Sequence, residues 1–176
     1  MKIGFCGTMS VGKTTLVKAL QDSGKFPGYE FITERSKYLS ELGIPLNTDS
    51  TLKGQTIFLA ERCAELICEN IVTDRTVLDV MAFTLLAKDI RYSSKEKFVD
   101  FAKYFLSDYD YIFYISPEGI EIEDNGIRTT DSLYREEVDF SIKFLSNQYR
   151  GLIKNFHTIS GTTDERISQI VNIMGL

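Results

Sequence analysis

The sequence has few of the residues from which metal sites and disulfide frameworks are built. Its three cysteines, Cys6, Cys63 and Cys68, include no pair with the C-x-x-C spacing of a zinc or redox motif. Its single histidine, His157, lies in an apolar stretch, and one imidazole cannot build a histidine-based metal site. We therefore expect reduced thiols in the core, a structural histidine and a cytoplasmic location.

Long apolar runs and an excess of basic residues are also missing. No run approaches the roughly 18 apolar residues of a membrane helix, and an expected strand takes the place of a signal peptide at the start. The net charge of −5 argues against wholesale binding to nucleic acid or an acidic membrane. The 176 residues, 43% hydrophobic and 26% charged, are typical of one globular domain over residues 1–176.

Short apolar runs alternate with longer stretches of helical periodicity along the chain. The expected strands are residues 1–6, 29–32, 71–74, 111–115 and 156–159. The expected helices begin near residue 15 and cover about 34–42, 51–69, 77–87, 93–106 and 132–147, with a last helix capped at 162–165 and a capping box at 93–96. This alternation predicts an α/β fold of three layers, in which helices flank a five-stranded parallel sheet. Ligands of such folds bind where the strands end.

The stretch 7–14, Gly-Thr-Met-Ser-Val-Gly-Lys-Thr, matches the pattern G-x-x-x-x-G-K-[ST] between an expected strand and helix. Glycines permit a tight turn whose N–H groups point at phosphate oxygens, and the helix N-terminus adds partial positive charge. Lys13 would reach the β- and γ-phosphates, and the Thr14 hydroxyl would hold Mg²⁺. The pattern predicts a nucleoside triphosphate bound by Gly7, Ser10, Val11, Gly12, Lys13, Thr14 and Thr15.

Charged pairs follow two further strands. The Asp74 carboxylate could hold Mg²⁺ beside the phosphate loop. The planar guanidinium group of Arg75, with its parallel N–H donors, suits a phosphate or a ribose hydroxyl. Glu34, followed by Arg35, would orient or deprotonate the hydroxyl group of a second substrate, to which the terminal phosphoryl group of the triphosphate is transferred. Plainer alternatives remain open: Asp74 could cap the next helix and pair with its own arginine, and Glu34 could be a first-turn glutamate favoured by the helix dipole.

The polar stretch 117–131, which contains glycine and follows the clearest strand, predicts a lid. Arg128, or Arg135 on the next helix, would fold over the phosphates, where an arginine contributes on the order of 10³–10⁵ in rate. The alternative is a solvated loop with surface arginines. Gly161, after the last strand, would allow close approach of the nucleotide base, or belong to a loop in which Thr162 caps a helix.

Four stretches carry a resemblance: 7–16 (Gly-Thr-Met-Ser-Val-Gly-Lys-Thr-Thr-Leu), 32–39 (Ile-Thr-Glu-Arg-Ser-Lys-Tyr-Leu), 73–83 (Thr-Asp-Arg-Thr-Val-Leu-Asp-Val-Met-Ala-Phe) and 124–128 (Asp-Asn-Gly-Ile-Arg). With them the chain resembles the P-loop nucleoside and nucleotide kinases, above all the small AAA-type domain that includes the nicotinamide riboside kinase portion of NAD-regulating proteins. It departs from that group's usual Glu-x-Ala-Arg at residues 34–37, which read Glu-Arg-Ser-Lys, so the acceptor stays open.

The resemblance implies ATP with Mg²⁺ as phosphoryl donor and a small nucleoside or nucleoside monophosphate, such as a deoxynucleotide or nicotinamide riboside, as acceptor. It also implies that Arg75 helps hold the acceptor, as the Asp-Arg motif of thymidylate kinases and the Glu-Arg motif of deoxyribonucleoside kinases do. The expected catalytic residues are Lys13, Glu34, Asp74 and Arg128, and the expected acceptor-binding residues are Glu34, Arg35, Arg75 and Arg135.

A regulatory ATPase or switch module that acts on a protein partner is the alternative function. The sequence has no Asn-Lys-x-Asp base reader of a guanine switch and leaves little room for the helical lid domain of an AAA+ motor. A polynucleotide 5′-kinase would need a basic stripe that this acidic chain lacks. A small-molecule kinase is therefore favoured, and a homodimer is left open.

Overall fold

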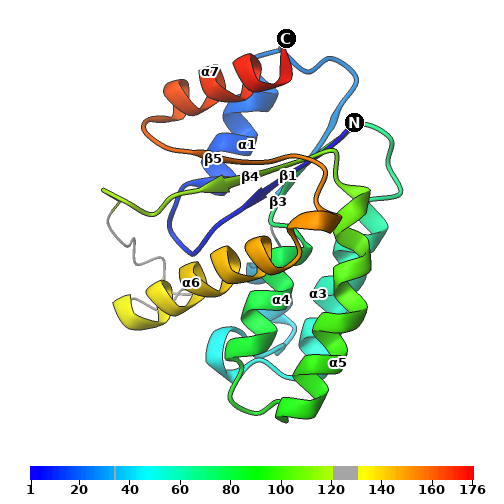
Figure 1. Cartoon of the computed structure of the whole chain (residues 1–176). Coiled ribbons are helices and arrows are strands. Elements are labelled where there is room, and N and C mark those ends of the chain that lie inside the picture. The colour runs from blue at the N-terminus through cyan, green and yellow to red at the C-terminus, as the bar shows by residue number, and fades with distance from the viewer. Residues whose placement is uncertain (34, 121–130) are drawn as a thin grey trace.

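A parallel sheet forms the middle layer of the computed structural model, which describes residues 1–33, 35–120 and 131–176 (Figure 1). Its strands are β1 (Lys2–Cys6), β2 (Glu30–Ile32), β3 (Ile71–Asp74), β4 (Tyr111–Ile115) and β5 (Phe156–Ile159). The strand order is β2-β3-β1-β4-β5, and every neighbouring pair is parallel. The expected α/β fold with a five-stranded parallel sheet is therefore confirmed.

Helices cover both faces of the sheet (Figure 1). One face carries α1 (Lys13–Asp22) and α7 (Thr163–Met174), and the other carries α3 (Leu52–Glu65), α4 (Val77–Leu86), α5 (Tyr92–Ala102) and α6 (Ser132–Gln148). The short helix α2 (Ser36–Glu41) follows β2. None of the helices in the described residues is long and apolar enough to cross a membrane.

The central strands β1 and β4 read as almost unbroken apolar runs because both of their faces are buried. In β4, Ile112 and Tyr114 belong to the core beneath α3 to α6, whereas Phe113 and Ile115 belong to the core beneath α1 and α7. A strand covered on both sides shows no alternation of polar and apolar residues. His157 on β5 packs its ring 5.9 Å from that of Phe113, as expected of a structural histidine.

Several helix boundaries differ from the prediction, and α5 ends at Ala102 rather than near residue 106. Helix α3 ends at Glu65 rather than near residue 69. The capping box expected at Ser93 is wrong, because the N-cap of α5 is Arg91, whose carbonyl accepts hydrogen bonds from the N–H groups of Ser94 and Lys95. Ser93 therefore already lies in the first helical turn, where its hydroxyl makes no cap. The box expected at Thr162 is present and opens α7.

Candidate functional site

The loop between β1 and α1 has the backbone shape of an anion cradle. Its φ angles are positive at Gly7 (150°), Ser10 (58°) and Gly12 (80°), a region that favours glycine. A Cβ atom on Gly7 would lie 2.9 Å from the carbonyl oxygen of Ile115, so only glycine fits beside β4. Helix α1 begins directly after the loop, at Lys13, and directs its N-terminus at the same place.

Lys13 is folded into this loop and only 6% exposed. Its Nζ donates hydrogen bonds to the carbonyl oxygens of Gly7 at 2.6 Å and Thr8 at 2.7 Å. The ammonium group is thereby held at the centre of the cradle, where it can meet a phosphate oxygen without a large change of side-chain conformation.

Thr14 and Asp74 meet because β1 and β3 are neighbours in the sheet, with Phe5 paired to Asp74. The Thr14 hydroxyl donates a hydrogen bond to Oδ2 of Asp74. Asp74 is 1% exposed, and its Oδ1 has no hydrogen-bond partner among the described residues. A hydroxyl beside a buried carboxylate with an unused oxygen offers the hard ligands that Mg²⁺ prefers.

These residues suit a magnesium ion shared with a phosphate ligand better than a cage made of protein alone. Mg²⁺ in kinase sites is held by one or two protein groups, and waters and phosphate oxygens complete its shell. The described residues contain no cluster of three or more histidine, cysteine, aspartate or glutamate side chains that could hold a metal. The pair Thr14 and Asp74 therefore fits the expected ion.

Arg75 is fixed at the end of β3 with a positive φ of 83°. Its N–H donates to the carbonyl oxygen of Phe5 at 2.9 Å, its Nη1 lies 3.6 Å from Oδ1 of Asp79, and its guanidinium stacks 4.9 Å from the Phe83 ring centre. The backbone bond, the ion pair and the ring contact together orient one side chain. Such a planar, oriented fork suits a ligand with two adjacent oxygen atoms.

Asp79 links Arg75 to the phosphate loop and was missed by the sequence analysis. The buried carboxylate accepts hydrogen bonds from the N–H of Gly7 at 3.3 Å and from the N–H of Thr76 at 2.8 Å. Burial raises the pKa of Asp79, while the positive charges of Lys13 and Arg75 act to lower it. The sequence signal was the capping box Thr76-Val-Leu-Asp79 at the start of α4.

An open hollow of about 400 Å³ lies above the phosphate loop. Gly161, with a φ of 91°, lines it from the end of β5, so the predicted base-contacting residue does face the loop. Arg166 on α7 also lines it and was not predicted. The loop residues along the same hollow are Ser10, Val11, Gly12, Lys13, Thr14 and Thr15.

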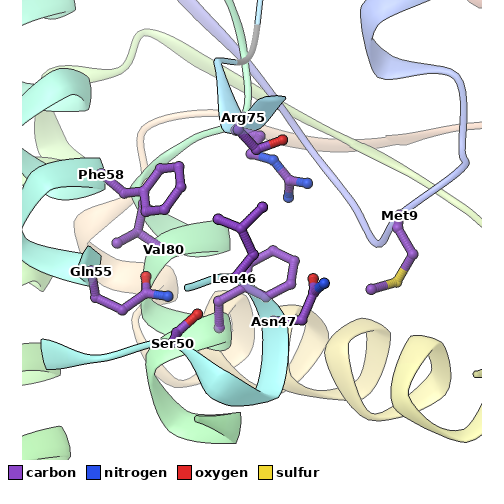
Figure 2. A pocket seen from close by; sticks show the side chains of 10 residues that line it. Met9, Leu46, Asn47, Ser50, Gln55, Phe58, Arg75 and Val80 are labelled. Atoms are coloured by element: carbon purple, nitrogen blue, oxygen red, sulfur yellow. The ribbon is translucent and has the colours of Figure 1, made fainter. Parts of the chain in front are cut away.

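A second, smaller cavity of about 50 Å³ is lined by Met9 of the same loop (Figure 2). In Figure 2, Met9 and Phe58 lie on opposite sides of it, and Arg75 reaches toward it from the end of β3. The Gln55 side chain is 3% exposed, and the buried Ser50 Oγ has no hydrogen-bond partner among the described residues. The remaining lining residues are Ser36, Leu46, Asn47, Val80 and Phe83.

Two aromatic residues that the sequence analysis does not name as site residues line this cavity. Phe58 comes from α3 and Phe83 from α4, and both rings line it together with the Gln55 amide. Aromatic faces beside a buried amide resemble the linings of small-molecule sites, where a few polar groups orient a mostly apolar ligand. Neither ring could be assigned from periodicity, since both also pack against the main core.

The other predicted arginines lie in different surroundings. Arg35 is exposed, pairs with Glu61 at 3.6 Å and stacks over the Tyr38 ring at 4.8 Å. Arg135 donates through Nε to the carbonyl oxygen of Met9 at 3.3 Å and through Nη1 to that of Ile120 at 2.8 Å. Arg135 therefore ties α6 to the phosphate loop and to the segment after β4. Glu34, Arg128 and most of the expected lid lie outside the described residues.

A family model described as an AAA domain matches residues 2–166 of the chain, which is most of its length. The chain belongs to this AAA domain family. No curated protein matches the sequence at a significant level.

Three solved structures illustrate the fold that this AAA domain shares with nucleoside and nucleotide kinases. Deoxyadenosine kinase from M. mycoides with bound dCTP has a TM-score of 0.67 at 20% identity, covering 99% of both chains. Thymidylate kinase from Ehrlichia chaffeensis has a TM-score of 0.65 at 14% identity, covering 99% of this chain and 98% of the other. NadR protein in complex with NR has a TM-score of 0.70 at 17% identity, covering 99% of this chain but 51% of the NadR chain. The expected resemblance to P-loop nucleoside and nucleotide kinases is confirmed in the fold.

Proposed function

We propose that this AAA domain transfers the γ-phosphoryl group of ATP to a small nucleoside or nucleoside monophosphate. The observation that carries the proposal is that neighbouring residues of the phosphate loop line two cavities. Ser10 lines the large hollow above the loop, and its neighbour Met9 lines the small cavity. A triphosphate bound on the loop would thus present its terminal phosphate toward the second cavity, which is the arrangement that phosphoryl transfer between two bound substrates requires.

The loop would bind the donor. Backbone N–H groups between Gly7 and Thr15 would contact the phosphate oxygens, and the Lys13 ammonium would leave the carbonyl oxygens of Gly7 and Thr8 to meet the β- and γ-phosphates. Gly161, at the far wall of the hollow, would leave room for the base. Thr14 and Asp74 would hold Mg²⁺, which supplies positive charge beside the β- and γ-phosphate oxygens.

The small cavity would bind the acceptor. Phe58 and Phe83 offer faces for a planar ring, and the Gln55 amide offers both a donor and an acceptor to the edge of a base. Arg75 would hold a ribose hydroxyl or a phosphate. At about 50 Å³ the cavity must widen to admit a nucleoside, so movement of the segment around Leu46 and Asn47 is part of the proposal.

In the transfer step, an acceptor hydroxyl oxygen bonds to the γ-phosphorus as the bond from that phosphorus to the β,γ-bridging oxygen breaks. ADP leaves, and the hydroxyl proton passes to a base, for which we propose Glu34. Lys13 and one further arginine would stabilise the negative charge of the group in transit. That arginine is Arg128 of the lid segment 117–131 or Arg135 of α6. Arg35 would contact the acceptor once released from Glu61. Residues 1–176 would act as one domain, and the cytoplasmic location stays a prediction.

A panel assay tests the proposal. The protein is incubated with ATP and Mg²⁺ and, one at a time, ribonucleosides, deoxyribonucleosides, their monophosphates and nicotinamide riboside, and products are detected by mass. A phosphorylated product from one class, lost in Lys13→Ala, is the expected result. ADP formed at one rate with or without any acceptor would contradict the kinase and favour the regulatory ATPase.

A further inference from the structure

Arg166 on α7 is a buried cation that has no counter-ion among the described residues. Its side chain is 5% exposed, and no described carboxylate forms an ion pair with it. The neighbouring Glu165 is engaged elsewhere, because its carboxylate accepts hydrogen bonds from the N–H and the hydroxyl of Thr162. A buried charge without a partner is unfavourable, so an uncompensated arginine calls for an explanation.

The guanidinium lies directly against the phosphate loop. Its Nη1 donates a hydrogen bond to the carbonyl oxygen of Val11 at 2.8 Å, and its buried Nε has no hydrogen-bond partner within residues 1–33, 35–120 and 131–176. A Cβ atom on Gly12 would approach Nη1 to 3.2 Å, so the side chain fills the space that this glycine leaves. Arg166 also lines the large hollow, and part of the group therefore faces the space above the loop.

The surroundings of Arg166 favour an anionic occupant of that hollow. Burial lowers the pKa of the Arg166 guanidinium, and no carboxylate in the described part of the chain offsets this effect. An arginine nevertheless remains protonated at neutral pH. The positive end of α1 and the Lys13 ammonium are directed at the same hollow, so three sources of positive charge converge there. A bound polyanion would satisfy all three at once.

We propose that the triphosphate tail of the donor nucleotide is the missing counter-ion of Arg166. The inference rests on the proposed binding of ATP and adds a donor-binding residue from the last helix of the chain. A charged hydrogen bond of this kind is worth about 1.5–3 kcal/mol, which corresponds to about 10–100-fold in affinity.

Calorimetric titration with ATP and with inorganic tripolyphosphate, which lacks base and sugar, tests this assignment. Arg166→Met is expected to weaken both ligands by a similar factor of about 10–100, whereas Arg166→Lys, which keeps the charge, is expected to retain most of the affinity. The loss of one charged contact should also make the binding of tripolyphosphate to Arg166→Met less dependent on salt. Arg91→Met, at the exposed start of α5, is the matched control and should bind like wild type.

Three results for Arg166→Met would overturn the assignment. If Arg166→Met weakened ATP but not tripolyphosphate, the arginine would contact the base or sugar. If affinity fell while the salt dependence stayed at the wild-type value, Arg166 would only support the loop through Val11. Wild-type affinity in Arg166→Met would exclude any role in binding. If wild-type protein bound neither ligand, the proposed function would fail as well, so the two failures are distinguishable.

Discussion

At the scale of single residues, the site depends on contacts between groups far apart in the sequence. Thr14 and Asp74 are separated by 60 positions, yet their side chains share a hydrogen bond. The same site includes Asp79, which accepts a hydrogen bond from the phosphate loop, and Gln55 and Phe58, which line the small cavity. No motif in the sequence marks Gln55 or Phe58. Each can equally be a core residue, and only its position beside the cavity distinguishes it.

Asp74→Asn is expected to impair metal-dependent activity while leaving the fold intact. The amide keeps the size of the carboxylate and can still accept the Thr14 hydrogen bond, but it loses the negative charge. We expect the apparent affinity for Mg²⁺ to fall by about 10–100-fold, measured by titrating Mg²⁺ against ATP turnover. Asp110→Asn, just before β4 at the opposite edge of the sheet, should titrate like wild type.

At the scale of elements, the ends of helices were harder to predict than their existence. Two capping patterns were expected, and only the one at Thr162 is present. In that box the Thr162 hydroxyl accepts a hydrogen bond from the N–H of Glu165, and the Glu165 carboxylate accepts one from the N–H of Thr162. Ser93 is not a cap, because the helix has already begun before it: the carbonyl oxygen of Arg91 accepts hydrogen bonds from the N–H groups of Ser94 and Lys95.

Thr162→Ala is expected to destabilise the chain by about 1 kcal/mol, because the first turn of α7 loses its side-chain cap. The free energy of unfolding from urea titration measures the effect. Thr163→Ala removes a hydroxyl from the next residue, inside the helix, and should cost less. Equal losses in the two variants would contradict the role of the cap.

Helix α3 is joined to the end of β3 by a buried ionic cluster. Arg62, 2% exposed, donates to the carbonyl oxygen of Asp74 at 3.0 Å and to Oε1 of Glu65 at 2.5 Å. Burial raises the pKa of Glu65 to about 7, although the charge of Arg62 acts to lower it. The cluster therefore couples the strand end that carries Asp74 to a group that titrates near neutral pH.

Glu65 makes stability depend on pH in a defined direction. Because the pKa is about 7 in the fold and 4.5 as its ordinary value, the folded chain binds more protons between these values, and stability falls as pH rises through that window. The effect is at most about 3 kcal/mol. Urea titrations from pH 5 to about 8 should show this decline in wild type and in the exposed control Glu41→Gln, and a flatter profile in Glu65→Gln. An unchanged slope in Glu65→Gln would sink the assignment.

At the scale of the whole molecule, the strand order decides where the site lies. With β1 between β3 and β4, the phosphate loop emerges beside both Asp74 and the segment after β4. Helices α6 and α7 then approach the loop from the two faces of the sheet, through Arg135 and Arg166. Segments from the whole length of the chain therefore surround one loop.

ATP with Mg²⁺ is expected to stabilise the whole chain against heat. A ligand at 100 times its Kd adds about 2.7 kcal/mol, or about 5–10 °C in Tm for a chain of this size. Thermal scans with and without ligand measure the shift. Lys13→Ala should lose most of it, whereas Lys18→Ala, exposed on the same helix, should keep it. A wild type without any shift would contradict donor binding.

The sequence by itself determined the element order, the parallel sheet and the phosphate loop, because these depend on local signals: buried apolar runs, helical periodicity, and glycines at a tight turn before Lys13. It also determined that polar residues at strand ends would gather at one edge. Only the tertiary structure decided which of them meet. The pairing of Thr14 with Asp74, the cavity around Gln55, and the uncompensated charge of Arg166 arise from the packing of elements distant in the chain, and no local pattern encodes such contacts.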